Sequence, residues 1–323
     1  MHVLSTRECD LQVTQFQCGG IAVAYSYNHY VADGAAIWHF MKSWSEAARH
    51  LSISVLPSHK RTPFRLPPAE PSADDRSHGE LYDSIDVTCK PIQGGSPQLS
   101  MPETVQQLFT FKKEMLQTLK SLANTGEVDG ESPACTTYEA LCGHIWRSAT
   151  KARVLPPNEI TKFNVTVDCR QRVSPSPPPF LFGNMLCNVV AILTAGELGS
   201  NDLGFAARSV QAAIKQKANP TKVQELLDWV GRQGNKYFRY NLGLTNDFGV
   251  SGSSRFPCFE VDFGWGAPVA VRGGASRWSG TISIFPAHEC GAIDVTLILP
   301  PDAMCRLASD SEFLEPSMMA LSK

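Results

Sequence analysis

One long stretch, from Pro57 to about Leu99, divides the chain of 323 residues. Proline, serine, aspartate and glycine replace there the apolar patterns found on either side. Proline and glycine interrupt helices and strands, and runs of this composition are typical of exposed connections. With 43% hydrophobic residues, the chain can bury a large core, and it is longer than one typical domain, so two domains or one large one fit best. The sequence therefore predicts an N-terminal domain over residues 1–75, a crossover linker over 76–98 and a C-terminal domain over 99–323.

Before the crossover, the pattern predicts a hairpin followed by a helix. Residues 11–29 hold alternating and apolar segments that are split by Gly19-Gly20, which is typical of a β-hairpin or a bulged strand. This unit ends at His29. Asp33 and Gly34 then begin a helix that runs to Arg49, because apolar residues recur near helical spacing over this range.

Regular patterns return after the crossover and predict an α/β fold class. Thr136 or Thr137 can cap one of the helices, with Glu139 in its first turn. The residues 249–252 and 273–274 are rich in glycine but fit no phosphate-binding fingerprint, so they are predicted to be turns. Strands are predicted over 105–111, 163–167, 189–193, 281–285 and 293–299, and helices over 112–123, 138–151, 203–217 and 221–233.

Charge and cysteine usage limit the partners and the compartment. A formal net charge of -2 gives no field that would hold nucleic acid or an anionic membrane. The N-terminal residues lack the apolar segment of a signal peptide, and no apolar run is long enough to span a bilayer. The ten cysteines stand apart, without a Cys-x-x-Cys pair, which favours free thiols in a reducing cytosol. We therefore expect a cytoplasmic monomer with neither nucleic acid nor membrane as a partner.

The segment His29-Tyr-Val-Ala-Asp33 lies where the predicted hairpin gives way to the helix. A histidine at a strand end can act as a general base near neutral pH, because its ordinary pKa is about 6.5. Asp33 could orient the ring, or it could bond to a distant arginine and stabilise the turn. Taken alone, this spacing also occurs by chance, and a purely structural histidine is then the alternative. Ser26 is predicted on the opposite face of the strand, so a serine nucleophile is not indicated.

A second distinctive block is Asp262-Phe-Gly-Trp-Gly266. Gly264 and Gly266 permit backbone conformations that other residues resist, while Phe263 and Trp265 supply large apolar anchors. The block is therefore predicted to be a packing turn rather than a catalytic site. No grouping of His, Cys, Asp and Glu has the spacing of metal ligands, so no metal site is expected.

Together these blocks resemble the BAHD family of plant acyl-CoA-dependent acyltransferases over nearly the whole chain. The resemblance also rests on Leu11 to Gly20, Thr137 to Arg147, Asp168-Cys-Arg-Gln-Arg172 and Phe182-Gly-Asn184. It implies the two-domain CoA-dependent acyltransferase fold, in which mixed sheets are flanked by helices.

The same resemblance implies roles for individual residues. His29 would be the catalytic base at the interface of the two domains. Asp33 would pair with Arg170 and organise the active-site turn, with Arg172 as the fallback partner. Gly34 and the five residues from Asp262 to Gly266 would support the site structurally. Thr245 would contact substrate or the oxyanion, although the tryptophan that many relatives place near it is missing here.

By resemblance, the chain moves a hydroxycinnamoyl or benzoyl group from acyl-CoA to an amine or alcohol, with no covalent intermediate. Acyl-CoA is then a co-substrate, and no bound cofactor is expected. Arg255, Arg272 and Arg277 are the candidates for binding its phosphates. The path through Gly252 and Ser254 instead resembles malonyl-transferring members, so a malonyl-CoA-dependent transferase is one alternative.

The beginning of the chain departs from the family pattern. Only 28 residues precede His29, whereas family members carry several strands and at least one helix there. We therefore expect an N-terminally truncated chain with an incomplete N-terminal domain. A second alternative follows from this expectation: an inactive remnant that only binds CoA or a full-length relative. A hydrolase is a third, but nothing in the sequence marks its nucleophile.

Overall fold

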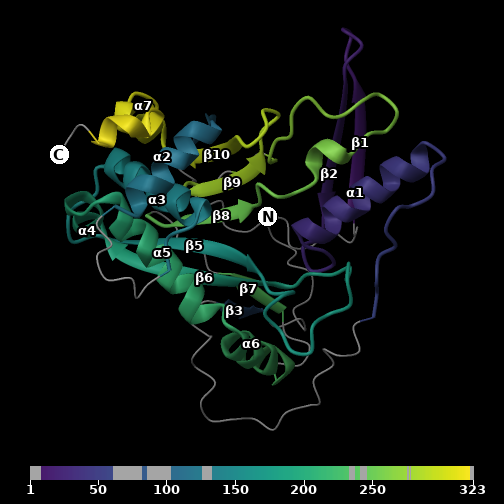
Figure 1. Ribbon diagram of the computed structural model, residues 1–323, viewed down its shortest axis with the longest axis horizontal. Helices are drawn as coiled ribbons and strands as arrows, with labels where there is room; N and C mark the ends of the chain where they lie inside the picture. The colour runs from purple at the N-terminus through teal and green to yellow at the C-terminus, as the bar shows by residue number, and fades with distance from the viewer. Residues whose placement is uncertain are drawn as a thin grey trace, which may run out of the picture.

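The computed structural model describes residues 9–60, 82–85, 103–125, 133–232, 237–240, 246–274, 276 and 278–320. Its centre is a six-stranded mixed sheet (Figure 1). The order across the sheet is β4 (Val105–Phe111), β10 (Ile293–Leu299), β9 (Thr281–Pro286), β8 (Phe248–Gly252), β5 (Ile160–Asp168) and β6 (Leu186–Thr194). Neighbouring strands are antiparallel, except that β8 runs parallel to both of its neighbours, β9 and β5.

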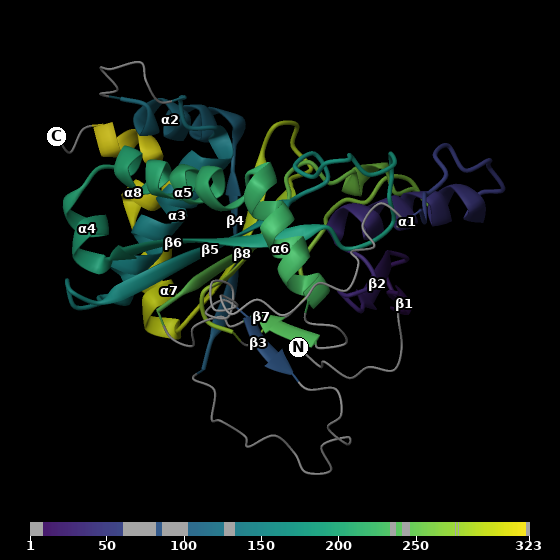
Figure 2. The ribbon, with the colours of Figure 1, turned by 90° about the horizontal axis from the view of Figure 1, so that it is seen from below.

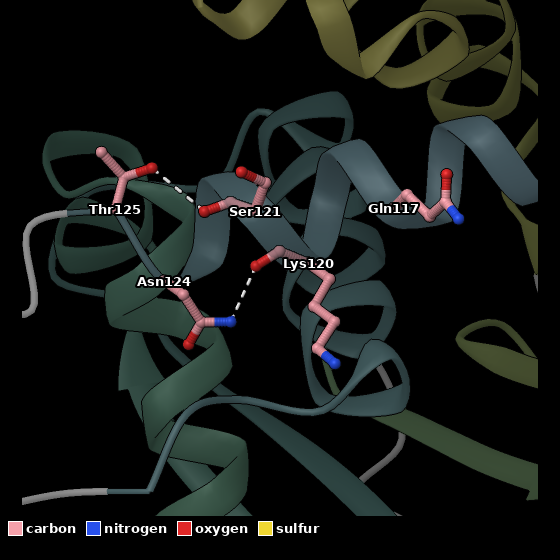
Figure 3. Close-up of a pocket in the computed structure, with 5 residues that line it drawn as sticks. All are labelled: Gln117, Lys120, Ser121, Asn124 and Thr125. Atoms are coloured by element: carbon pink, nitrogen blue, oxygen red, sulfur yellow. Dashed lines mark hydrogen bonds between the residues drawn. The ribbon is translucent and has the colours of Figure 1, made fainter.

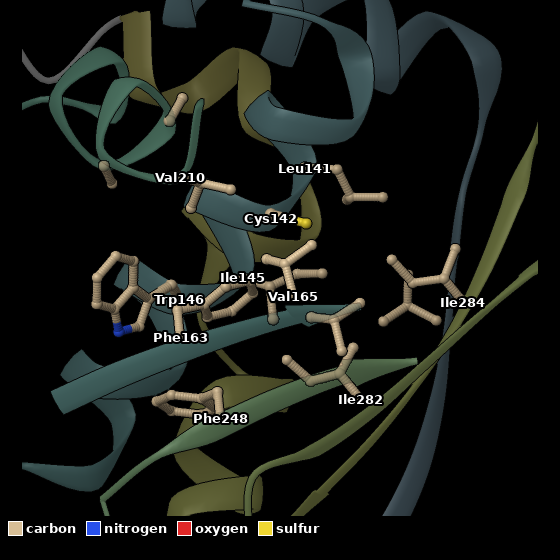
Figure 4. Packing of buried hydrophobic residues seen from close by; sticks show 14 of the residues in the cluster. Leu141, Cys142, Ile145, Trp146, Phe163, Val165, Val210, Phe248, Ile282 and Ile284 are labelled. Atoms are coloured by element: carbon tan, nitrogen blue, oxygen red, sulfur yellow. The ribbon is translucent and has the colours of Figure 1, made fainter. Parts of the chain in front are cut away.

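Helices cover one face of this sheet (Figure 2). They are α2 (Lys113–Ala123), α3 (Thr137–Arg153) and α5 (Leu203–Lys217). Trp146 of α3 packs on Phe163 of β5 with ring centroids 5.4 Å apart, and Val165, Ile282 and Ile145 fill the space around them (Figure 4). Each such buried side chain contributes roughly 1.5–3 kcal/mol through the hydrophobic effect. This layer is therefore the main core.

Helix α3 begins where the sequence predicts it. Thr136 accepts a hydrogen bond from the backbone N–H of Glu139, and the carboxylate of Glu139 accepts one from the backbone N–H of Thr136. This reciprocal pair satisfies two backbone donors that the first turn leaves free. Of the two candidate caps, Thr136 is therefore the one that the structure uses.

The N-terminal unit is the predicted hairpin and helix. Strand β1 (Cys9–Gln15) pairs antiparallel with β2 (Ile21–Tyr27), and α1 (Gly34–Ala48) follows. Helix α1 does not share the main core. Its buried side chains Ile37, Trp38 and Met41 pack with Cys258 and Val261 from the other half of the chain. The two halves thus share a second, smaller core.

Several further elements complete the fold. The crossover region contains β3 (Tyr82–Ile85), which pairs antiparallel with β7 (Tyr237–Tyr240) and which the sequence did not predict. The predicted helix over 221–233 is α6 (Pro220–Arg232). The other elements, also missed from sequence, are α4 (Ala195–Ser200), α7 (Pro301–Ala308), α8 (Ser311–Leu314) and the 3-10 helices η2 (Cys258–Glu260) and η3 (Pro316–Ala320).

The prediction of a turn at residues 249–252 is wrong, because these residues belong to β8 in the middle of the sheet. Phe248 and Val250 are buried as a central strand requires. Gly252 has φ +86, and a Cβ there would lie 2.3 Å from the carbonyl oxygen of Ile284. Glycine is therefore needed where the two strand backbones approach each other, and it hides the alternation by which strands are recognised.

The proposed domain boundaries stay a prediction, because most of residues 76–98 lie outside the described residues. Among the described residues, no helix combines the length and the apolar character that crossing a membrane requires.

Candidate active site

His29 lies just beyond the end of β2, in a turn. The backbone N–H of Val31 donates to the carbonyl oxygen of Asn28 at 2.9 Å, and the backbone N–H of Tyr30 donates to the Asn28 side chain at 3.0 Å. The imidazole is half-buried and packs against Tyr27 with ring centroids 5.3 Å apart. Burial, with the nearby charge of Asp33, raises the pKa of Tyr27 to about 12, so its hydroxyl stays protonated at neutral pH. The turn thus presents one imidazole that solvent can reach.

Asp33 is fully buried below this turn and makes an ion pair with Arg170. Arg170 Nη1 donates to Asp33 Oδ2 at 2.7 Å and Nη2 donates to Oδ1 at 3.1 Å. The same carboxylate caps α1 by accepting from the N–H of Ala36 at 3.0 Å, and it accepts from the N–H of Met185 at 3.0 Å. A buried charge with this many partners is compensated, so Asp33 fixes where α1 begins.

Arg170 lies two residues after the end of β5 and contacts the segment 181–186. Burial alone would lower its pKa, but the hydrogen bonds and charges of Asp33 and Asp168 outweigh burial and raise the pKa above its ordinary value. Its Nη2 also donates to the carbonyl oxygens of Leu181 at 3.3 Å and Gly183 at 3.1 Å. Arg172, the fallback partner, donates instead to the carbonyl oxygen of Ala218 at 2.8 Å. The structure therefore joins Asp33 to Arg170 and leaves Arg172 elsewhere.

Gly34 leaves room for an aromatic ring. A Cβ at this position would lie 2.4 Å from Cζ of Phe256. That ring packs between Trp38 and Phe285, with centroids 6.3 Å from each. Any side chain at Gly34 would have to displace it, so the first residue of α1 is small because of packing.

The block from Asp262 to Gly266 holds the other end of α1. The Asp262 carboxylate accepts from the N–H of Gly264 at 2.7 Å and of Gly266 at 3.0 Å, and it pairs with Arg49 at 3.3 Å. The Gly264 N–H, together with the Gly266 N–H and Arg49 and against the effect of burial, lowers the pKa of Asp262. Arg49 is the C-cap of α1, so ion pairs fix this helix at both ends.

In this block the two glycines adopt positive φ angles, and the two aromatic side chains differ in how much they are exposed. Gly264 and Gly266 have φ +100 and +94, conformations that favour glycine. Phe263 packs edge-on against Trp44 of α1 with ring centroids 4.6 Å apart. Trp265 lies beside Phe263 but is 60% exposed. Phe263 is therefore an anchor on α1, while most of Trp265 faces solvent.

Asn184, which belongs to the Phe182-Gly-Asn184 stretch, contacts His29. Its Nδ2 donates to the carbonyl oxygen of His29 at 2.7 Å and lies 3.3 Å from the ring Nδ1. The sequence shows the stretch that contains Asn184, but it cannot show a contact between two residues that lie 155 positions apart.

Comparison with known proteins identifies the family to which this chain belongs. A family model described as the transferase family matches residues 6–314. The BAHD acyltransferase DCR of Arabidopsis thaliana is 34% identical over 315 residues, and the shikimate O-hydroxycinnamoyltransferase of Nicotiana tabacum is 31% identical over 286 residues. The chain belongs to this BAHD acyltransferase family.

The match covers most of this chain but less of its BAHD relatives. It covers 94% of this chain and 62% of the Arabidopsis protein, and 86% and 63% for the tobacco protein. The chain thus spans about three fifths of the length of these relatives.

Solved structures are similar at the level of the fold. F. sporotrichioides TRI101 complexed with coenzyme A and T-2 has a TM-score of 0.76 at 20% identity, with 95% of this chain and 68% of that chain covered. Vinorine synthase has a TM-score of 0.67 at 18% identity, with 95% and 67% covered. The expected acyltransferase fold, a mixed sheet flanked by helices, is therefore confirmed.

Two of the remaining candidates, Arg255 and Arg272, lie within the described residues. Thr245 and Arg277 lie outside the described residues. Arg272 donates to the Asp294 carboxylate at 2.9 Å, so its charge is paired. Arg255 is exposed within the turn at residues 253–256. No described contact joins Arg255 or Arg272 to the turn of His29.

Two shallow hollows lie away from this turn. One, at the C-terminal end of α2, is lined by Gln117, Lys120, Ser121, Asn124 and Thr125 (Figure 3). Asn124 and Thr125 donate to the carbonyl oxygens of Lys120 and Ser121, so these donors serve the helix end itself. The other lies beside the start of α6. Within the described ranges, no three His, Cys, Asp or Glu residues are grouped as metal ligands.

Proposed function

We propose that this chain acts as an acyl-CoA-dependent acyltransferase with His29 as its general base. The donor would be an aromatic acyl-CoA, hydroxycinnamoyl or benzoyl, and the acceptor an amine or alcohol. Relatives named as hydroxycinnamoyltransferases, such as that of tobacco, support this donor class. The observation that carries the proposal is the half-buried imidazole on a turn whose start and end are bonded to the rest of the fold.

The proposed reaction needs one proton relay and no covalent enzyme intermediate. His29 takes the proton of the acceptor O–H or N–H while the acceptor attacks the thioester carbonyl carbon. The tetrahedral intermediate then breaks its C–S bond, and the CoA thiolate recovers the proton from His29. Atoms and charge balance within the two substrates. Asp33 and Arg170 act only by holding the turn, because all the oxygens of Asp33 are used by other partners.

A second candidate is a chain that binds CoA or a full-length relative without turnover. Exposed apolar side chains on the hairpin favour association, since Leu11, Val13 and Phe16 are 44%, 56% and 52% exposed. Malonyl transfer, another alternative, is supported only by the residues after Gly252.

The test is turnover by the purified chain with coumaroyl-CoA, benzoyl-CoA and malonyl-CoA, each with shikimate and a panel of amines. Released thiol and acylated product are measured separately. General bases contribute typically 10²–10⁴-fold, so we expect His29→Ala to lower product formation by at least about 100-fold. His39→Ala is the matched control, because His39 lies on the neighbouring helix α1 and its ring bonds to the Val55 carbonyl oxygen in the loop after that helix.

Each outcome separates the candidates. Product from the wild type and from His39→Ala but not from His29→Ala supports the proposal. Equal background from all three proteins contradicts the proposal and favours a chain that binds CoA or a full-length relative without turnover. Malonylated product alone supports the malonyl alternative, and thiol release without any acceptor indicates hydrolysis.

A further inference from the structure

The proposed reaction places negative charge on the thioester oxygen, where a hydrogen-bond donor stabilises it. The backbone N–H groups of Tyr30 and Val31, the two residues after His29, already donate to Asn28. They could not meet this charge without giving up the bonds that shape the turn. Thr245, which the family resemblance suggests for this contact, lies outside the described residues. The donor is therefore sought among the other side chains beside His29.

Tyr27 is the last residue of β2, and its ring lies beside that of His29. Side chains two residues apart on a strand lie on the same face, and the ring centroids are indeed 5.3 Å apart, with an angle of 38° between the planes. The phenol hydroxyl is thus at the rim of a ring that is a direct neighbour of the imidazole. A substrate that gives its proton to His29 therefore also lies beside Tyr27.

The Tyr27 hydroxyl is available as a donor. No described residue forms a hydrogen bond with it, and it is not among the described polar atoms that are both unpartnered and buried from solvent. Burial of the ring and the charge of Asp33 raise its pKa to about 12, so it keeps its proton at neutral pH. The Asp33 charge itself is paired with Arg170. A protonated phenol of this kind can donate one hydrogen bond to a ligand.

We propose that Tyr27 is a catalytic residue that donates a hydrogen bond to the thioester oxygen as this oxygen becomes an oxyanion. The inference rests on the proposed function and names the oxyanion donor of the same reaction. While His29 takes the acceptor proton, the carbonyl carbon becomes tetrahedral and its oxygen gains the charge that the phenol O–H stabilises. When the C–S bond breaks, the oxygen returns to a carbonyl, and the thiolate recovers the proton from His29. Tyr27 keeps its own proton throughout.

The alternative role of Tyr27 is packing. Its ring contacts the smaller core between the two halves and lies 6.1 Å from the ring of Tyr25. Packing uses the ring, whereas the proposed catalysis uses the hydroxyl, so Tyr27→Phe separates the two roles. Tyr25→Phe is the matched control. Tyr25 precedes Tyr27 by two residues on the same face of β2, and its ring packs edge-on against Trp38 at 5.8 Å.

The experiment measures kcat and KM for the wild type, Tyr27→Phe and Tyr25→Phe, with coumaroyl-CoA and the acceptor that the wild type uses best. Removing one oxyanion donor typically costs 10²–10³-fold in kcat, so we expect Tyr27→Phe to lower kcat by about 100-fold or more. A donor that acts only in the transition state should leave KM within about threefold. Tyr25→Phe should keep both constants near those of the wild type. Urea unfolding of all three proteins checks that each is equally folded.

Three results would overturn the inference. The first is a wild-type kcat in Tyr27→Phe, and the second is a raised KM with kcat retained, which means that the hydroxyl serves substrate binding alone. The third is an equal loss in Tyr27→Phe and Tyr25→Phe, which assigns the effect to packing. Any of these beside wild-type turnover that His29→Ala abolishes rejects the role of Tyr27 and leaves the proposed function intact. Absence of turnover by the wild type rejects both.

Discussion

In the layer between the six-stranded sheet and helices α3 and α5, contacts are mainly apolar, whereas the turn from His29 to Gly34 is held by polar bonds (Figure 4). Asp33 and Arg170 form a buried pair there, and the backbone of Gly183 and Met185 adds two bonds to Asp33. Apolar packing has no preferred direction, but an ion pair in a buried place requires fixed geometry. The core should therefore tolerate conservative substitutions that the turn does not.

The difference between the apolar core and the polar turn is tested most strongly by Arg170→Met. This substitution leaves the fully buried Asp33 carboxylate without its charge partner. Breaking one side of a buried pair costs about 3 to 5 kcal/mol, so we expect the free energy of unfolding in urea to fall by that amount. Arg172→Met is the control, because it removes one hydrogen bond to Ala218. An equal or larger loss in the control would contradict the role given to the pair.

The core is tested by substitutions at Leu141 of α3, which is fully buried. Leu141→Ala should cost about 3 kcal/mol because it leaves a cavity, while Leu141→Met, which conserves volume, should cost less than about 1.5 kcal/mol. In the turn, Arg170→Lys conserves charge but loses the two-pronged bond to Asp33. We expect this conservative change to cost more than Leu141→Met in the same urea measurement. The reverse order would remove the distinction between the two regions.

The same difference explains what the sequence could predict of the fold. The hairpin, α1, α2, α3, α5 and the strands β9 and β10 follow apolar periodicity and are confirmed. Strand β8 was missed because glycine stands where its backbone approaches β9. Helix α7 was missed although Pro301 at its first position is a helix-start signal.

The contacts of the candidate active site were harder to predict from apolar periodicity than the fold was. Periodicity places His29 at a strand end and Asp33 at a helix start, but it cannot show that Arg170, 137 residues away, is the partner. That pair came from family resemblance. The direction in which Asn184 points depends on the path of residues 181–186, which contain no periodic pattern from which it could be deduced.

A buried histidine in the main core gives a smaller expected effect than the loss of Arg170. His144 contacts the Phe313 carbonyl oxygen through Nε2 at 3.1 Å and stacks on the Phe313 ring. Burial lowers its pKa from 6.5 to about 4, and the bond to Phe313 only partly opposes this. Below about pH 6.5 the unfolded chain therefore binds a proton that the folded chain does not, and stability falls until the pH reaches about 4.

This linkage predicts a loss of about 2 kcal/mol between about pH 7 and pH 5 in the wild type that is absent in His144→Gln. Urea unfolding of both proteins at the two pH values gives the difference, and effects of carboxylates cancel because both proteins share them. Parallel pH dependence would mean that the imidazole is not held neutral by the core.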